Sequence, residues 1–210
     1  MIARADGAST ERLRHPNAVH GAATKLDWLR KPMPDVAAPA AIRPSATAAV
    51  MILFLDFDGV LHADPCFDEA RLFACAPDLA QALEPFPEVR IVLSTSWRSQ
   101  RTLAEMVQPL PDGLRRRVVD ATPLVTSADM PAALRPYRRQ AECTTWLRSQ
   151  GHELTAWVAL DDRPSLFAPH CEHLILCDSN VGFVDATARR LQAALLRGRF
   201  RRLQPIRAAG

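Results

Sequence analysis

The chemistry that this sequence could support centres on Asp56 and Asp58, within the stretch FLDFDGVLH at residues 54–62. The two aspartates stand where an apolar run ends, and Gly59 follows them directly. Carboxylates this close repel each other, so the pKa of one should rise unless a positive charge lies between them. The pair is therefore either a solvated turn or part of a site that holds a cation and performs chemistry.

Two later apolar runs also end in side chains that could bind a metal ion or a phosphate. The run VRIVLSTSW (89–97) ends in hydroxyl residues and TAWVALDD (155–162) ends in acids, which are Ser94, Thr95, Ser96, Asp161 and Asp162. Ligands of open α/β sheets bind outside the carboxyl ends of the strands, so we expect these groups around one crevice. Four carboxylates there require a cation, and carboxylate oxygens suit Mg²⁺. The bound ion would also keep Asp56 ionised.

The pattern of apolar residues predicts the elements that must position this crevice. Continuous apolar runs indicate buried strands of a parallel sheet, and segments with helical spacing lie between them. Strands that alternate with helices are typical of an α/β domain with a doubly wound, mostly parallel sheet. The predicted strands are 50–57, 89–97, 116–122, 155–162 and 173–178, and the predicted helices are 67–86, 99–110, 135–151 and 185–200.

The chain divides by composition into three parts. Residues 1–48 are rich in alanine, proline and charge without a sustained hydrophobic period, so we expect an extended or disordered segment. Residues 49–198 contain nearly all of the predicted strands and helices and should form the folded domain. Residues 199–210 form a basic tail, which either follows a phosphate backbone or ends as a solvated helix.

Composition narrows the class of protein further. With 210 residues, of which 48% are hydrophobic and 23% charged, the chain suits one globular domain with extensions. The net charge of +3 is too small to indicate nucleic-acid binding by itself. The five cysteines form no Cys-x-x-Cys pair, which favours a reducing, cytoplasmic environment. Neither a secretory signal nor an apolar run near the roughly 18 residues of a membrane span is present, so we expect no membrane partner.

The motifs DFDGVL and ALDDR resemble those of the haloacid dehalogenase (HAD) superfamily of phosphotransferases. As in that superfamily, a hydroxyl residue ends the strand that follows DFDGVL, and a basic residue precedes the ALDDR strand. The order and strand-end placement match over residues 50–195. The set LDFDGVLH, LSTSWR and WVALDDR is similar to the minimally capped HAD domains of Swiss Army Knife RNA-repair proteins. The resemblance implies a HAD-like Rossmannoid fold and a Mg²⁺-dependent phosphatase in residues 49–198.

The resemblance also implies a role for each acid. Asp56 would be the nucleophile that takes the phosphoryl group as an aspartyl-phosphate. Asp58 would protonate the leaving oxygen, deprotonate the attacking water, and ligate Mg²⁺ through its main-chain carbonyl. Asp162 would be a direct or water-mediated ligand of Mg²⁺, with Asp161 beside it.

The same resemblance suggests the residues that bind the phosphoryl group. Thr95 best fits the hydroxyl position because it stands two residues before Trp97, and Ser96 and Ser94 are the close alternatives. Arg139, at the start of the helix before ALDDR, is our choice for the cation, with Arg138 as the alternative. The family more often has lysine there.

Two other kinds of residue have simpler interpretations. His62 follows the first motif; contact with the substrate is one interpretation, and a surface histidine is the expected one. Trp97 and Trp146 are expected in the core.

The spacing of the motifs bears on the substrate. The segments between them are too short for a cap domain, so the cleft should be open. A phosphorylated small molecule, such as a nucleotide, or the phosphate end of a nucleic acid then becomes the expected substrate. A binding or regulatory module that keeps the fold without turnover is the alternative, although the intact Asp56 and Asp58 favour an enzyme. The sequence does not indicate an oligomeric state.

Overall fold

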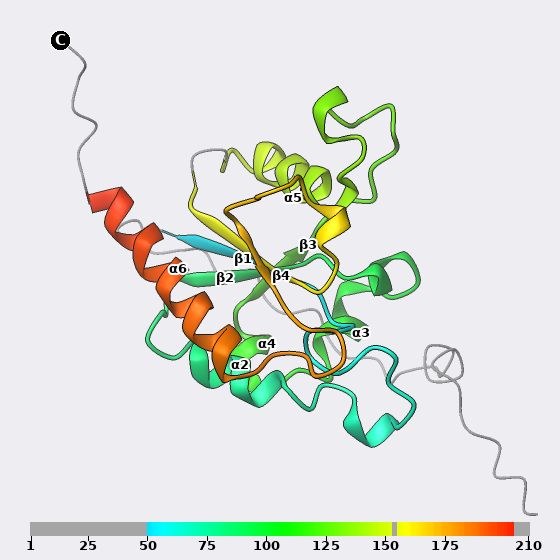
Figure 1. Ribbon diagram of the computed structural model, residues 1–210, viewed down its shortest axis with the longest axis vertical. Helices are drawn as coiled ribbons and strands as arrows, with labels where there is room; N and C mark the ends of the chain where they lie inside the picture. The colour runs from blue at the N-terminus through cyan, green and yellow to red at the C-terminus, as the bar shows by residue number, and fades with distance from the viewer. Residues whose placement is uncertain (1–49, 153–154, 204–210) are drawn as a thin grey trace, which may run out of the picture.

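A five-stranded parallel sheet forms the centre of the computed structural model, which describes residues 50–152 and 155–203 (Figure 1). The predicted segment 1–48 and residues 204–210 lie outside the described residues. The strands lie in the order β3-β2-β1-β4-β5, and each neighbouring pair is parallel. Their bounds are β1 Met51–Leu55, β2 Val89–Leu93, β3 Val118–Ala121, β4 Trp157–Asp161 and β5 Leu174–Leu176.

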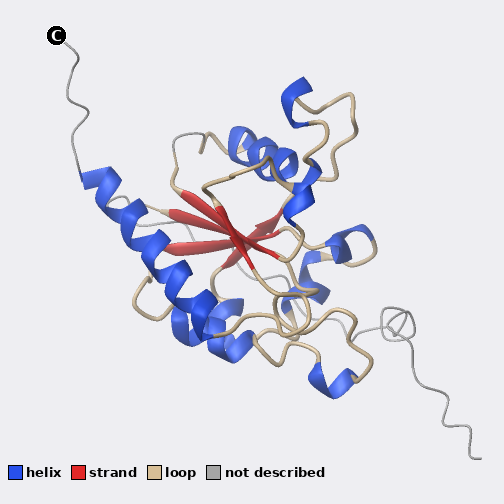
Figure 2. Cartoon of the chain, in the orientation of Figure 1, coloured by secondary structure: helices blue, strands red, loops and turns tan. Residues whose placement is uncertain are grey.

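Helices cover both faces of this sheet (Figure 2). The helix α5 packs on one face, and the other α-helices pack on the opposite face. Short 3-10 helices occupy several of the connections. The bounds are α2 Ala76–Ala82, α3 Leu103–Val107, α4 Asp112–Arg115, α5 Arg138–Ser149 and α6 Asp185–Leu203, with η1 Glu69–Arg71, η2 Ser96–Ser99, η3 Ala132–Leu134 and η4 Pro164–Leu166.

The strand β1 shows why the sheet is covered on both sides. All of its residues are apolar and buried, and alternate side chains of a strand point to opposite faces. Leu53 and Leu55 pack in the core that the sheet shares with α2 and α6. Phe54 packs on the other face, edge-on against Trp146 of α5, with 5.9 Å between the ring centroids. The predicted α/β fold with a parallel sheet is confirmed.

The predicted helix 67–86 is wrong in its first half. After η1 the chain turns at Phe73, whose φ is 61°, and α2 begins only at Ala76. The ring of Phe73 packs edge-on against Phe57 and Trp97, with centroid separations of 5.3 and 5.6 Å. This tertiary packing outweighs the helical spacing of the sequence.

Two other boundaries differ from the prediction. The helix predicted at 99–110 contracts to α3, which begins at a capping box formed by Thr102 and Glu105. The short α4 follows it and was not predicted. At the other end of the domain, the helix predicted at 185–200 is α6, which ends at Leu203.

The order of the strands defines where a ligand can bind. The chain passes from β1 outward to β2 and β3, and then returns to β4 on the other side of β1. The carboxyl end of β1 is therefore the switch point at which α/β sheets bind ligands. The connections that leave this edge consist of helices and loops, and the described residues form no cap domain over it. None of the helices in the described ranges is both long and apolar enough to cross a membrane.

Candidate active site

The register of the sheet brings three of the predicted polar residues to one level. Leu55, the last residue of β1, pairs with Leu93 of β2 and Leu160 of β4. Main-chain hydrogen bonds extend this pairing by one residue, because Ser94 N donates to Leu55 O at 2.9 Å and Asp56 N donates to Leu160 O at 3.1 Å. The residues next in line on three adjacent strands are Asp56, Ser94 and Asp161.

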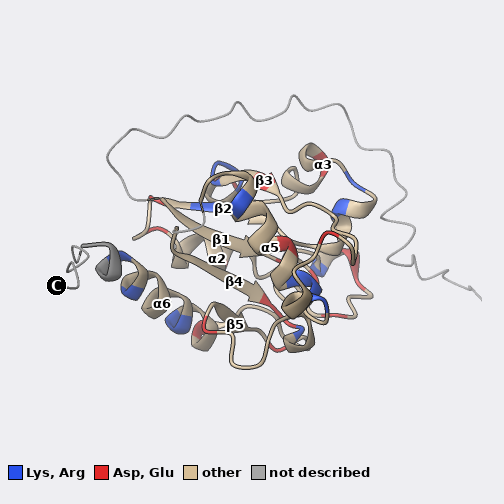
Figure 3. Ribbon diagram, turned by 90° about the horizontal axis from the view of Figure 1, so that it is seen from above, with Lys and Arg blue, Asp and Glu red and all other residues tan. Residues whose placement is uncertain are grey.

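The helix α5 carries the predicted cation to this edge of the sheet. Its apolar residues Cys143, Trp146 and Leu147 pack on the sheet. Arg139 and Glu142 continue the same buried stripe at helical spacing into the first turn. Because the apolar part fixes the rotation of the helix, the two charged residues project over the strand ends. Figure 3 shows acidic and basic residues close together where β4 ends and α5 begins.

Arg139 connects two of the predicted catalytic strands. Its Nη1 lies 3.0 Å from Asp56 Oδ2 and 2.9 Å from Asp161 Oδ2, and its side chain is only 7% exposed. Burial alone would lower the pKa of Arg139, but Asp56 and then Asp161 raise it above the ordinary value. The side chain of Arg138 is 58% exposed and contacts Glu142 instead. Of the two candidate cations, Arg139 is the one that contacts Asp56 and Asp161.

One guanidinium between two carboxylates leaves negative charge uncompensated. Burial raises the pKa of Asp161 to about 7, while Arg139 opposes the rise and Asp56 adds to it. Both oxygens of Asp161 have partners, since Oδ2 contacts Arg139 and Oδ1 accepts the main-chain N–H of Arg163 at 2.9 Å. Asp161 therefore serves mainly to hold the arginine.

Three carboxylates could hold a metal ion. Ligand oxygens of Asp56, Asp161 and Asp162 all lie within 4.8 Å of one another. Asp162 Oδ1 is buried without a hydrogen-bond partner, and Arg163 Nε, an ion-pair contact, is 3.9 Å away. Burial, followed by the charge of Asp56, raises the pKa of Asp162. A cation would satisfy this orphaned oxygen, so the residues present fit Mg²⁺. Asp162 has the oxygen without a partner, whereas Asp56 Oδ1 accepts the main-chain N–H of Phe57 at 2.8 Å and Asp56 Oδ2 contacts Arg139.

The side chain of Asp58 does not belong to this carboxylate group. Trp97 Nε1 donates a hydrogen bond to Asp58 Oδ2 at 3.0 Å, and His62 Nε2 lies 3.2 Å from Asp58 Oδ1. Because His62 Nδ1 accepts the main-chain N–H of Phe73 at 3.4 Å, the ring proton lies on Nε2, which donates to Asp58. Two N–H groups thus fix the carboxylate that is predicted to transfer protons. Metal ligation through the main-chain carbonyl of Asp58 stays a prediction.

These contacts change the interpretation of His62 and Trp97. The prediction that His62 lies at the surface is wrong, because the residue is only 2% exposed. Trp97 is buried as predicted, yet its indole N–H also serves the site. The spacing of Asp58 and His62, four residues apart across a turn, was the available signal for the first contact.

Gly59 lets the main chain after Asp58 pass close to the carboxylates of the candidate metal site. Its φ is +68°, in the left-handed region that favours glycine. A Cβ added at this position would lie 2.4 Å from Asp162 Oδ2, far inside van der Waals contact. The loop can lie against Asp162 only because residue 59 has no side chain.

The three candidate hydroxyl residues occupy different environments. Thr95 is fully buried, and its Oγ1 accepts the main-chain N–H of Trp97 at 3.4 Å as the cap of η2. Ser96 is exposed. Ser94 is level with Asp56, and residues level with each other on parallel strands point to the same face. The alternative Ser94 therefore has a better position beside Asp56 than Thr95, and phosphate binding by any of the three stays a prediction.

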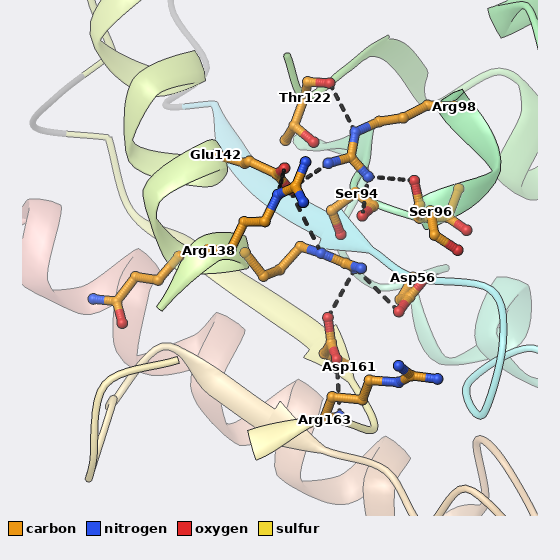
Figure 4. Close-up of polar contacts among 12 residues, drawn as sticks. Asp56, Ser94, Ser96, Arg98, Thr122, Arg138, Glu142, Asp161 and Arg163 are labelled. Carbon is orange, nitrogen blue, oxygen red and sulfur yellow. Dashed lines mark hydrogen bonds and ion pairs between the residues drawn. The ribbon is translucent and has the colours of Figure 1, made fainter. Parts of the chain in front are cut away.

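A second buried ion pair supports the site, and it was not predicted from the sequence. Arg98 of η2 pairs with Glu142 of α5 (Figure 4). Arg98 Nε donates to Thr122 O at 3.0 Å and Nη1 donates to Ser94 O at 2.8 Å. This side chain therefore joins the carboxyl ends of β2 and β3 to α5. Glu142 Oε2 also lies 3.8 Å from Arg139 Nε, so the pair helps to hold the cation in place. Glu142 stands three residues after Arg139, on the same side of the helix, and this spacing could have indicated that Glu142 is buried beside it.

More than half of the chain matches a known family. A family model described as "HAD domain in Swiss Army Knife RNA repair proteins" matches residues 52–188. The matched range runs from β1 into α6 and contains every residue of the candidate site. No curated protein and no solved structure matches the chain.

Proposed function

We propose that the chain, which belongs to the family of HAD domains in Swiss Army Knife RNA repair proteins, is a Mg²⁺-dependent phosphatase that works through an aspartyl-phosphate on Asp56. Membership of this family supports phosphoryl transfer in general. The observation that carries the specific proposal is the contact of Asp56 with Arg139, a buried carboxylate 3.0 Å from a buried guanidinium at the switch point of the sheet. A nucleophile beside a fixed cation is the arrangement that phosphoryl transfer requires.

Asp56 and Asp162 are the proposed ligands of the metal ion. The buried oxygen of Asp162 without a hydrogen-bond partner supports this assignment. When bound there, Mg²⁺ would supply positive charge against the phosphoryl oxygens. Gly59 keeps the loop close to Asp162, and Asp161 holds Arg139.

In the first step, an oxygen of Asp56 attacks phosphorus and forms the aspartyl-phosphate. The bond between phosphorus and the leaving oxygen breaks, and Asp58 gives its proton to that oxygen. The N–H groups of Trp97 and His62 hold the Asp58 carboxyl group in one orientation. Arg139 compensates charge on the outer phosphoryl oxygens with a planar fork of donors.

In the second step, water attacks the phosphorus of the aspartyl-phosphate. Asp58, now ionised, accepts a proton from this water. The bond between phosphorus and Asp56 breaks, inorganic phosphate leaves, and both aspartates return to their starting states.

The proposed substrate is a phosphate monoester, either a nucleotide or the phosphate end of a nucleic acid. The absence of a cap domain over the described site supports a substrate that is larger than the site itself. The name of the family refers to RNA repair, which agrees with this class of substrate.

Hydrolysis of p-nitrophenyl phosphate, followed by a panel of nucleotides and phosphorylated oligonucleotides, tests the proposal. We expect turnover that requires Mg²⁺ and that EDTA abolishes. Asp56→Asn should remove the activity without a loss of fold. Asp112→Asn is the matched control, because the side chain of Asp112 is 78% exposed in α4, away from the carboxyl edge of the sheet. Wild-type turnover in Asp56→Asn would contradict the mechanism. Binding without turnover of any substrate would favour the silent module instead.

A further inference from the structure

A cavity of about 400 Å³ lies beside the candidate site, and arginine side chains dominate its wall. Among the described residues that line it, four are arginines and Glu142 is the only acid, so positive charge exceeds negative charge along its wall. The arginines come from different elements: Arg98 from η2, Arg138 and Arg139 from α5, and Arg163 from the loop after β4. Figure 4 shows Arg98, Arg138 and Arg163 around Glu142, Asp56 and Asp161.

The four arginines differ in the freedom that they have to bind a ligand. Arg139 is buried beside Asp56 and Asp161, where the proposed function already assigns it to the phosphoryl group at Asp56. Arg98 is buried, and its guanidinium group is committed to Glu142 and main-chain carbonyls. Arg138 and Arg163 have side chains that are 58% and 60% exposed. Arg138 bonds Glu142 through Nε, and the contacts of Arg163 with Asp162 and Asp64 are long, at 3.9 and 3.5 Å. These two arginines can therefore turn their outer nitrogens to a ligand.

The position of the cavity relates it to the reaction. Arg139 lines the cavity and also contacts Asp56, so a single guanidinium group lies between the cavity and the proposed nucleophile. A second arginine-lined cavity, with Arg90, Arg116 and Arg117, lies at the opposite edge of the sheet. There Arg117 is tied to the carbonyls of Leu83 and Phe86, which indicates a structural role.

We propose, on the basis of the function proposed above, that the cavity binds a second phosphate of the same substrate molecule. One phosphate is hydrolysed at Asp56 while Arg138 and Arg163 hold the other. Guanidinium groups match phosphate oxygens with paired hydrogen bonds, and excess positive charge in a hollow attracts a dianion. Leu124, which is 53% exposed, and Leu166 provide apolar wall for the sugar or base that joins the two phosphates.

Calorimetric titration of nucleotides into the Asp56→Asn protein, in the presence of Mg²⁺, measures binding at the cavity without turnover. Adenosine 3′,5′-bisphosphate should bind about tenfold more tightly than adenosine 5′-monophosphate or 3′-monophosphate. Arg138→Ala and Arg163→Ala, each added to Asp56→Asn, should reduce this preference several-fold, and the double variant should abolish it. Arg116→Ala, an exposed arginine at the opposite edge, is the matched control and should keep the preference.

A dinucleotide with one terminal phosphate separates two sources of the second phosphate. If it binds as tightly as the bisphosphate, the cavity accepts the diester of a chain, and if it binds as the monophosphates do, the cavity requires a free second phosphate. Equal affinity for the monophosphates, the bisphosphate and the dinucleotide would overturn the inference, as would a full preference in the double variant. Turnover of p-nitrophenyl phosphate by the wild-type protein reports on the proposed function independently.

Discussion

Removal of the Arg139 guanidinium should reduce both activity and stability, and the structure indicates the size of each loss. Arg139 Nη1 lies 3.0 Å from Asp56 and 2.9 Å from Asp161, so Arg139→Ala leaves two buried carboxylates without their cation. Removing one partner of a buried ion pair costs about 3–5 kcal/mol. For a protein of this size, such a loss lowers Tm by on the order of 10 °C. Loss of one transition-state donor lowers kcat by about 100-fold or more.

Steady-state hydrolysis of p-nitrophenyl phosphate at saturating Mg²⁺ measures the effect on activity, and calorimetry gives the Tm of each variant. Arg138→Ala is the matched comparison, because the Arg138 side chain is 58% exposed and the buried Glu142 keeps its other partner, Arg98. It should lower kcat for this substrate much less than Arg139→Ala. Arg139→Lys separates charge from geometry, since lysine restores a point charge without the fork, and its kcat should fall between the other two.

Wild-type kcat in a folded Arg139→Ala protein would refute the assignment of Arg139. A larger loss in Arg138→Ala would move the role to Arg138. If both variants were silent, Arg98 would be the next residue to test, although its guanidinium already bonds Glu142 and the carbonyls at the ends of β2 and β3.

Three further predictions concern other parts of the site. Gly59→Ala should destabilise the fold by about 1–3 kcal/mol and weaken Mg²⁺ binding, because its Cβ would displace Asp162; unchanged Mg²⁺ affinity in a titration would contradict this. Trp97→Phe keeps the ring but removes the donor to Asp58, so kcat should fall by about tenfold with a smaller effect on Tm, and wild-type kcat would exclude this role. Burial raises the pKa of Asp161 to about 7, so between pH 4 and 7 the folded protein binds more protons than the unfolded chain. In EDTA the free energy of unfolding should therefore fall as the pH rises from 4 to 7, by at most about 4 kcal/mol. Asp161→Asn should remove this pH-dependent component, and an equal pH dependence in both proteins would contradict the prediction.

Continuous apolar runs made the strands predictable. The strands β1 and β4 are buried along their whole length, so each is recognisable in the sequence as a continuous apolar run. The edge strands β3 and β5 are only partly buried. The helix predicted at 67–86 was partly wrong because Phe73 takes a positive φ to join an aromatic cluster with Phe57 and Trp97. The sequence of residues 67–86 does not indicate this packing, because Phe57 and Trp97 lie outside the segment. His62 was missed for a related reason, since its partners are a carboxylate and a main-chain N–H that meet only in the folded loop.

The sequence by itself determined the α/β class, the strands, and the placement of Asp56 and Asp161 at strand ends. These properties depend on neighbours along the chain. Only the tertiary structure decided which arginine meets those carboxylates. Arg138 and Arg139 are adjacent in sequence, but successive residues of an α-helix point about 100° apart. The packing of Trp146 and its neighbours against the sheet sets the rotation of α5, which buries Arg139 against the carboxylates and leaves Arg138 in solvent.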